Sequence, residues 1–115
     1  MRMFMNSGDN DKRIERRIKQ QFVVGVRTMR GLNIAYTIDV SRWGVKVGSP
    51  QLLFPLGEPV ELIIDKHGER HPFSGRVIRE DGEYYINRLK RSVNAFFIRI
   101  DDGRYPNFMI DNCFI

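Results

Sequence analysis

The chain has 115 residues, 42% hydrophobic and 11% aromatic, which is enough apolar material for one folded domain and argues against wholesale disorder. The formal net charge is +5, and residues 1–30 hold the whole excess, with eight basic against three acidic side chains. This asymmetry favours an anionic partner bound by the N-terminal segment over a uniformly basic surface.

The first 21 residues divide into a lead and a basic arm. Residues 1–12 contain a polar, glycine-containing stretch, and we expect them to form a flexible lead. Residues 13–21 are basic and polar with only two apolar side chains, so they lack a face that a packed helix would bury. From Phe22 onward β-branched and aromatic residues become frequent, and we expect residues 22–115 to form the folded domain.

Alternating apolar and polar residues predict strands in the first half of this domain. Residues 32–40 alternate throughout, and we expect one face of this strand to be buried, consisting of Leu32, Ile34, Tyr36, Ile38 and Val40. Trp43, Val45 and Val47 repeat the alternation in the next segment. We therefore expect Trp43 to pack into the core, although an indole could also stack on a base.

The same alternation predicts strands over residues 59–66 and 93–101. Their buried faces are expected to consist of Val60, Leu62 and Ile64 in the first strand and of Phe96, Ile98 and Ile100 in the second. Residues 67–70 indicate a turn, and Asp81-Gly82 indicates a tight hairpin between two further strands. The tail from residue 102 is expected to form a turn or a short helix.

Six or seven short strands joined mainly by turns, with little helix, predict a mainly all-β fold, either a small antiparallel barrel or a sandwich. Closure into a barrel would also protect the edges of strands this apolar. The longer connection over residues 48–58 carries two prolines and two glycines. Its apolar members are expected to fold back over the core, and they are Leu52, Leu53 and Phe54.

Residues 39–44, with the sequence DVSRWG, lie where one alternating run ends and the next begins. Side chains two apart on a strand share a face, so Asp39 and Ser41 would project together, and Gly44 would allow a tight turn or the close approach of a ligand. A carboxylate accepts two N–H bonds and a hydroxyl both donates and accepts, which suits the Watson–Crick edge of guanine. The same residues also suit an Asx- or Ser-type turn between strands, so both interpretations stay open.

Two motifs, taken in order along the chain, resemble those of the PilZ domain family, the bacterial receptors for cyclic di-GMP. The family's second motif is Asp or Asn, any residue, Ser, any two residues, Gly, and it is matched by Asp39, Ser41 and Gly44. Its first motif is Arg, any three residues, Arg, and it is matched by Arg13 and Arg17.

The resemblance covers about residues 11–101 and implies a PilZ-type β-barrel preceded by a flexible basic arm. In an alternative register, Arg17 takes the place of the first arginine of the motif and Gln21 the place of the second, which leaves the motif degenerate. We prefer the Arg13/Arg17 register because it keeps both guanidinium groups.

The resemblance also implies roles for individual side chains in binding cyclic di-GMP. Two arginines would contact guanine and phosphate, because guanidinium forks bind both groups, and Arg16 would support them as a further cation. The carboxylate and hydroxyl of the second motif would engage base edges, and its glycine would shape the turn. The candidate ligand-binding residues are therefore Arg13, Arg16, Arg17, Asp39, Ser41 and Gly44.

By the same resemblance, the arm would fold over the nucleotide against the barrel. Ordering of residues 8–21 would then change a surface for an unidentified protein partner. Some members of the family have lost the nucleotide motifs and act through protein contacts, so a degenerate adaptor that binds no nucleotide is the alternative. A binder of single-stranded nucleic acid is a third hypothesis, less favoured because the chain from Phe22 onward is charge-balanced over most of its length.

No catalytic site, metal site or cofactor is expected. No nucleophile–base pair or phosphate loop stands out, and His67 and His71 flank a turn with no third ligand marked by spacing. A single cysteine, Cys113, cannot form an intrachain disulfide. The start does not resemble a secretory signal, and no apolar run approaches the ~20 residues of a membrane span. We therefore expect a soluble, cytoplasmic protein that does not insert into a membrane.

Overall fold

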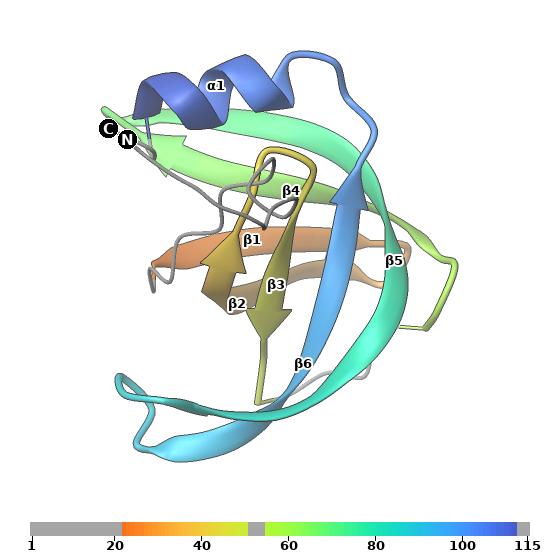
Figure 1. The fold of residues 1–115 in the computed structure, drawn as a ribbon, viewed down its shortest axis with the longest axis vertical. Helices are drawn as coiled ribbons and strands as arrows, with labels where there is room; N and C mark the ends of the chain where they lie inside the picture. The colour runs from red at the N-terminus through yellow and green to blue at the C-terminus, as the bar shows by residue number, and fades with distance from the viewer. Residues whose placement is uncertain (1–21, 51–54, 113–115) are drawn as a thin grey trace, which may run out of the picture.

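The computed structural model describes residues 22–50 and 55–112. Its elements in chain order are β1 (Val23–Thr28), β2 (Gly31–Val40), β3 (Gly44–Gly48), β4 (Pro59–Lys66), β5 (Glu69–Ile86), β6 (Arg91–Ile100) and α1 (Tyr105–Asn112). These strands close into a barrel in the order β1-β2-β3-β6-β5-β4 (Figure 1), and every neighbouring pair is antiparallel. The prediction of a mainly β, antiparallel barrel with a short C-terminal helix is confirmed.

Strand β1 closes the barrel, because it pairs with β2 on one side and with β4 on the other. Closure removes the long unpaired edges that an open sheet of this kind would present. The β4–β5 hairpin is tight, and His67 and Gly68 both have positive φ, of 54° and 77°. Two-residue hairpin turns that follow the right-handed strand twist need this backbone, so the turn predicted at residues 67–70 is confirmed.

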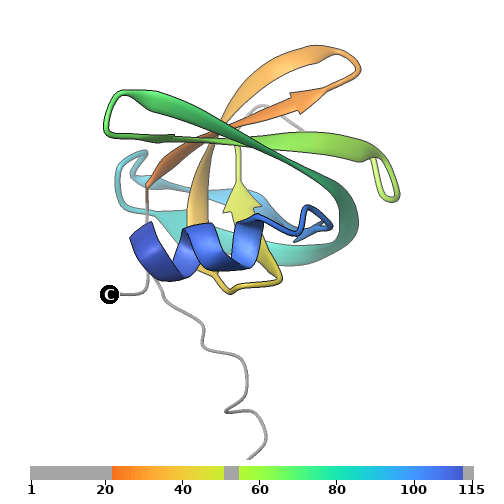
Figure 2. The same ribbon diagram turned by 90° about the horizontal axis from the view of Figure 1, so that it is seen from above.

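The core lies inside the barrel. The predicted inner faces of β4 and β6 are confirmed, since each of their residues exposes at most 6% of its surface: Val60, Leu62, Ile64, Phe96, Ile98 and Ile100. Helix α1 adds the fully buried Tyr105 and Met109, and Figure 2 shows this helix lying over one side of the barrel. The Tyr105 ring meets Phe73 of β5 edge-on, with the ring centroids 5.3 Å apart. The helix is therefore anchored to the barrel by its apolar face.

The predicted buried face of β2 is confirmed only at Val40, since Tyr36 and Ile38 are only half-buried. Leu32 and Ile34 are 46% and 54% exposed, whereas Ala35 is fully buried. The pairing with β1 sets this orientation, because Ala35 lies opposite the buried Val24 and directly opposed residues share a face. The apolar face that the alternation placed in the core therefore lies on the outside of the barrel.

A β-bulge near the end of β2 returns Val40 to the core. The register between β2 and β3 shifts between Thr37 and Asp39. An extra residue reverses the face on which later side chains lie, so Thr37 and Val40 are both buried although they are three residues apart. The prediction holds for Val40 for this reason, and the bulge also sets the orientation of the DVSRWG turn (residues 39–44) that follows.

The hairpin predicted at Asp81-Gly82 is wrong. Strand β5 runs without a break from Glu69 to Ile86, and Figure 1 shows it curving along the side of the barrel. The pairing with β6 continues on both sides of this dipeptide, with a register shift between Glu80 and Glu83. Gly82 has a φ of 81°, which suits a bulge as well as a turn, and the chain reverses only after Ile86. The predicted packing of residues 52–54 lies outside the described residues.

Candidate functional site

Ser41 closes the DVSRWG turn between β2 and β3. Its backbone N–H donates to the carbonyl oxygen of Gly44 at 2.9 Å, and its hydroxyl donates to the same oxygen at 3.4 Å. The hydroxyl oxygen also accepts a hydrogen bond from the backbone N–H of Trp43 at 3.2 Å. Ser41 is only 2% exposed, so its side chain serves the turn in this structure. The contact of Ser41 with a base edge stays a prediction.

Gly44 lies where β3 closely approaches β6. A Cβ atom at this position would lie 2.3 Å from the carbonyl oxygen of Ile98 and 2.7 Å from Cζ of Phe97. The carbonyl oxygen of Gly44 also accepts a hydrogen bond of 3.1 Å from the buried hydroxyl of Tyr105 in α1. Glycine is therefore needed here for space, and its carbonyl joins the turn to the helix.

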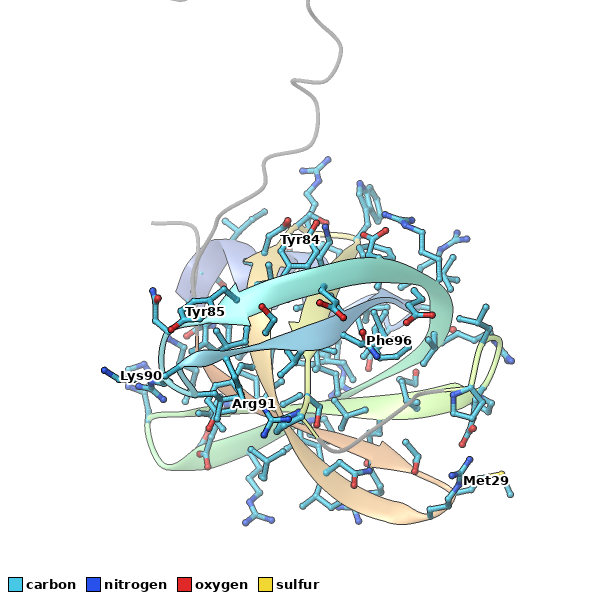
Figure 3. All side chains as sticks on the ribbon, turned by 90° about the horizontal axis from the view of Figure 1, so that it is seen from below. Met29, Tyr84, Tyr85, Lys90, Arg91 and Phe96 are labelled. Carbon is cyan, nitrogen blue, oxygen red and sulfur yellow. The ribbon has the colours of Figure 1, made fainter. Side chains whose placement is uncertain are left out.

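A buried lysine connects this turn to β5. Lys46 lies opposite Asp39 in the β2–β3 ladder, and its Nζ is 3.8 Å from Oδ2 of Asp39. The same Nζ lies 3.1 Å from Oδ2 of Asp81 and donates to the hydroxyl of Tyr84 at 2.9 Å. We call these four residues the Lys46 cluster, and Figure 3 labels Tyr84 on the long strand β5. Because Val40 faces the core, the neighbouring Asp39 carboxylate points to the outside of the barrel.

Opposing effects set the charge states in the Lys46 cluster. Burial alone would lower the pKa of Lys46, but its hydrogen bonds to Tyr84 and Asp81 and the nearby carboxylate charges raise the pKa above its ordinary value. Burial alone would raise the pKa of Asp81, but hydrogen bonds from Lys46 and Arg79 and their charges hold the pKa below its ordinary value. Lys46 and Asp81 are therefore both charged at neutral pH.

The charge of Asp81 should stabilise the fold at neutral pH and lose this effect in acid. The pKa of Asp81 is lower in the folded chain than the ~3.9 of an unfolded chain. The stabilisation is therefore complete above about pH 5 and is lost as the pH falls below that value and through the pKa of the folded chain. We expect Asp81→Asn to lower the Tm at pH 7 and the Tm difference from wild type to shrink between about pH 5 and pH 3. Thermal unfolding followed by circular dichroism across this range measures both values.

The exposed Asp65 of β4 offers a matched control for this experiment. The Tm difference between Asp65→Asn and wild type should change much less over the same pH range. If the Tm difference between Asp81→Asn and wild type stays constant down to pH 3, the charge of Asp81 beside Lys46 does not stabilise the fold.

The N-terminal segment joins the barrel beside Asp39. The backbone N–H of Phe22 donates to the hydroxyl of Thr37, and the N–H of Thr37 donates to the carbonyl of Phe22, both at 2.9 Å. Thr37 precedes Asp39 by two residues in β2. The boundaries expected after residues 12 and 21 stay predictions. So do the ligand contacts of three side chains outside the described residues, Arg13, Arg16 and Arg17.

Trp43 does not pack into the core as predicted. It is 47% exposed, whereas Val45 and Val47 are buried. Strand β3 begins only at Gly44, so the turn interrupts the alternation that had placed Trp43 in phase with the two valines. An exposed indole therefore lies within the DVSRWG turn.

His71 of β5 packs against an aromatic ring, with its centroid 4.7 Å from that of Phe108. Within residues 22–50 and 55–112, no group of three or more His, Cys, Asp or Glu side chains is arranged to hold a metal ion.

In the same part of the chain, no helix has both the length and the apolar character needed to cross a membrane.

The fold and the site together define a small closed antiparallel barrel with a polar turn motif beside the junction with a basic N-terminal segment. The family model described as PilZ domain matches residues 11–108. Since this match spans most of the chain, the chain belongs to the PilZ domain family, a family of receptor and adaptor domains for cyclic di-GMP.

Solved structures of other proteins share this fold, among them the following two. The PilZ domain of CeSA from a cellulose-synthesizing bacterium is 21% identical with a TM-score of 0.58, and the match covers 84% of this chain and 91% of that one. The Bacillus subtilis inhibitor of motility MotI/DgrA is 15% identical with a TM-score of 0.62, and the match covers 94% of this chain and 56% of that one. At these identities the likeness establishes the fold alone. No curated protein matches the sequence significantly.

Proposed function

We propose that this PilZ domain is a cytoplasmic receptor for cyclic di-GMP that signals through a protein partner and catalyses no reaction. The observation that carries the proposal is the position of the complete DVSRWG motif, beside the point where the chain enters the barrel from the basic arm. Hydrogen bonds between Phe22 and Thr37 fix this entry point. The match to the family spans residues 11–108, a range that includes both stretches that resemble its motifs.

The length of the arm allows its arginines to reach the DVSRWG turn. Arg17 precedes Phe22 by five residues and Arg13 precedes it by nine. An extended chain spans at most ~3.6 Å per residue, so these distances are at most about 18 Å and 32 Å. A nucleotide held against Asp39 therefore lies within reach of both guanidinium groups.

The chemistry of cyclic di-GMP fits this set of side chains. Each guanine presents an N–H and an NH2 group to an acceptor, and carboxylate oxygens of Asp39, whose side chain is 13% exposed and lies beside Lys46, would accept from them. The two phosphates suit arginine forks, which form bidentate charge-assisted hydrogen bonds. Ser41 and Gly44 hold the turn that carries this carboxylate, through the hydrogen bonds to the Gly44 carbonyl.

The signal would be a change in the protein surface around the arm. Residues 8–21 would move over the bound nucleotide and against the barrel, which creates or removes a surface for the partner. Fixing the arm has a cost in conformational entropy, so the charge-assisted contacts must exceed that cost. Added salt screens these contacts and should weaken binding.

A second candidate function is that of a PilZ adaptor that binds no nucleotide. One observation favours this candidate, because Ser41 and Gly44 both have a structural role in the turn that requires no ligand. The register that places Gln21 in the first motif would also remove one of the two arginines from the site. The adaptor would act only through protein contacts.

Isothermal titration of the full chain with cyclic di-GMP, with GTP as the control nucleotide, separates the two candidates. We expect saturable binding of micromolar or tighter Kd for cyclic di-GMP, weakened by added salt, and none for GTP. The stoichiometry tells one bound nucleotide from a stacked pair. No heat of binding and no shift in Tm at high cyclic di-GMP concentration would reject the receptor proposal in favour of the adaptor.

A further inference from the structure

Trp43 presents an exposed aromatic surface on a rigid main chain. The indole side chain belongs to a residue that is 47% exposed, between the half-buried Arg42 and the buried Gly44. The Trp43 backbone N–H donates to the Ser41 hydroxyl at 3.2 Å, and its carbonyl accepts from the N–H of Ile100 at 2.9 Å. The turn therefore holds the main chain on both sides of an aromatic ring that the core does not use.

Arg42 adds a cation and an unsatisfied donor beside this ring. Its guanidinium carbon lies 5.4 Å from the centroid of the Trp43 ring, within the range of a cation–π contact. The Nε of Arg42 is buried and has no hydrogen-bond partner among the residues that the structure describes. A guanidinium forms charge-assisted hydrogen bonds with phosphate oxygens, and a nucleotide stacked beside this ring would bring such oxygens.

We propose that Trp43 and Arg42 form a stacking subsite for one guanine base of cyclic di-GMP. Trp43 supplies the surface for the base, and Arg42 pairs with the anionic backbone of the same nucleotide. The inference rests on the proposed function and adds a second kind of contact to it. Asp39 offers acceptors to the edge of a base, whereas Ser41 and Gly44 offer no surface on which the face of a base could stack. Stacking on an aromatic side chain tolerates any base, so this subsite adds affinity and leaves base choice to the edge contacts.

The fluorescence of Trp43 tests this subsite directly. Trp43 is the only tryptophan in the chain, so emission excited at wavelengths that tyrosine does not absorb reports on this side chain alone. Titration of the full chain with cyclic di-GMP should quench the emission, and the quenching should saturate with the Kd measured by calorimetry. Titration of free N-acetyltryptophanamide with cyclic di-GMP corrects for light absorbed by the nucleotide.

Three substitutions complete the test by calorimetry. Trp43→Ala should weaken cyclic di-GMP binding about fivefold or more, and Trp43→Phe should recover part of the loss because a phenyl ring still stacks. Tyr85→Ala is the matched control, since Tyr85 is an aromatic residue 57% exposed near the end of β5 (Figure 3). It should bind like wild type. All three variants should melt cooperatively, because neither aromatic residue belongs to the core.

The possible results separate the subsite from the receptor function. Quenching together with a weaker Trp43→Ala variant supports the subsite. If wild type binds in the calorimeter but its emission does not change, or if Trp43→Ala binds as tightly as wild type, the subsite is rejected and the receptor proposal stands. If wild type does not bind cyclic di-GMP at all, both proposals are rejected.

Discussion

Arg17→Ala should remove most of the affinity for cyclic di-GMP and leave the ligand-free protein as stable as before. A hydrogen bond to a charged group contributes about 1.5–3 kcal/mol, which corresponds to a roughly ten- to hundredfold higher Kd when it is lost. The Tm of the ligand-free chain should change little, because residues 13–21 offer only two apolar side chains for packing. Isothermal titration and thermal unfolding of the same preparation measure both quantities.

Arg88→Ala is the matched control for this substitution. It removes the same charge from an exposed position between β5 and β6, far along β6 from the segment paired with Gly44. Its Kd should stay within about twofold of wild type, a difference of ~0.4 kcal/mol. Equal losses in both variants would mean that net charge, and no specific contact of Arg17, governs binding.

Single substitutions also decide between the two registers of the arginine motif. In the preferred register Arg13→Ala weakens binding as much as Arg17→Ala does, and Gln21→Ala has little effect. The opposite pattern, with normal binding by Arg13→Ala and weaker binding by Gln21→Ala, would establish the degenerate register.

Gly44→Ala should strongly destabilise the fold. The new methyl group would lie 2.3 Å from the carbonyl oxygen of Ile98, which is part of the β6 main chain and cannot rotate away. Overpacking of this kind costs about 1–3 kcal/mol or more, which corresponds to a Tm lowered by roughly 5–20 °C for a domain of this size. Thermal and urea unfolding monitored by circular dichroism measure the loss.

Gly103→Ala provides the control, because a Cβ atom there would have no heavy atom within 4 Å and the residue does not have a positive φ. We expect its Tm to be unchanged or slightly higher, since alanine restricts the unfolded chain. If Gly44→Ala melts at the wild-type temperature, the close approach of β3 to β6 is not a constraint on this turn.

The Lys46 cluster was not recognised in the sequence. Lys46 stands between two valines, and this position in an alternating strand indicates only a solvent-facing polar residue. Its partners Asp81 and Tyr84 are more than thirty residues further along the chain, and the pairing of β3 with β6 and of β6 with β5 brings them close. Only Asp39 of this cluster carried a signal in the sequence, as part of the DVSRWG motif.

Sequence periodicity predicted the strands well where one side of a strand faces the core throughout. The inner faces of β4 and β6 followed directly from alternation, because their core-facing residues keep the same phase. The predictions failed where a bulge or a turn changed the phase, as between Thr37 and Asp39, at Asp81-Gly82 and at Trp43. A bulge depends on the partner strand as much as on local residues, so alternation within one strand does not reveal it.

The sequence by itself determined that this chain is mainly β, that its positive charge lies in the N-terminal quarter and that two of its short stretches resemble motifs of the PilZ domain family. These properties are carried by neighbouring residues, through the two-residue period of a strand and through short motifs. The tertiary structure alone decided which face of β2 is buried and that Lys46 contacts β5. Strand register and the closure of the barrel set these features, because they arise from contacts between residues distant in the sequence.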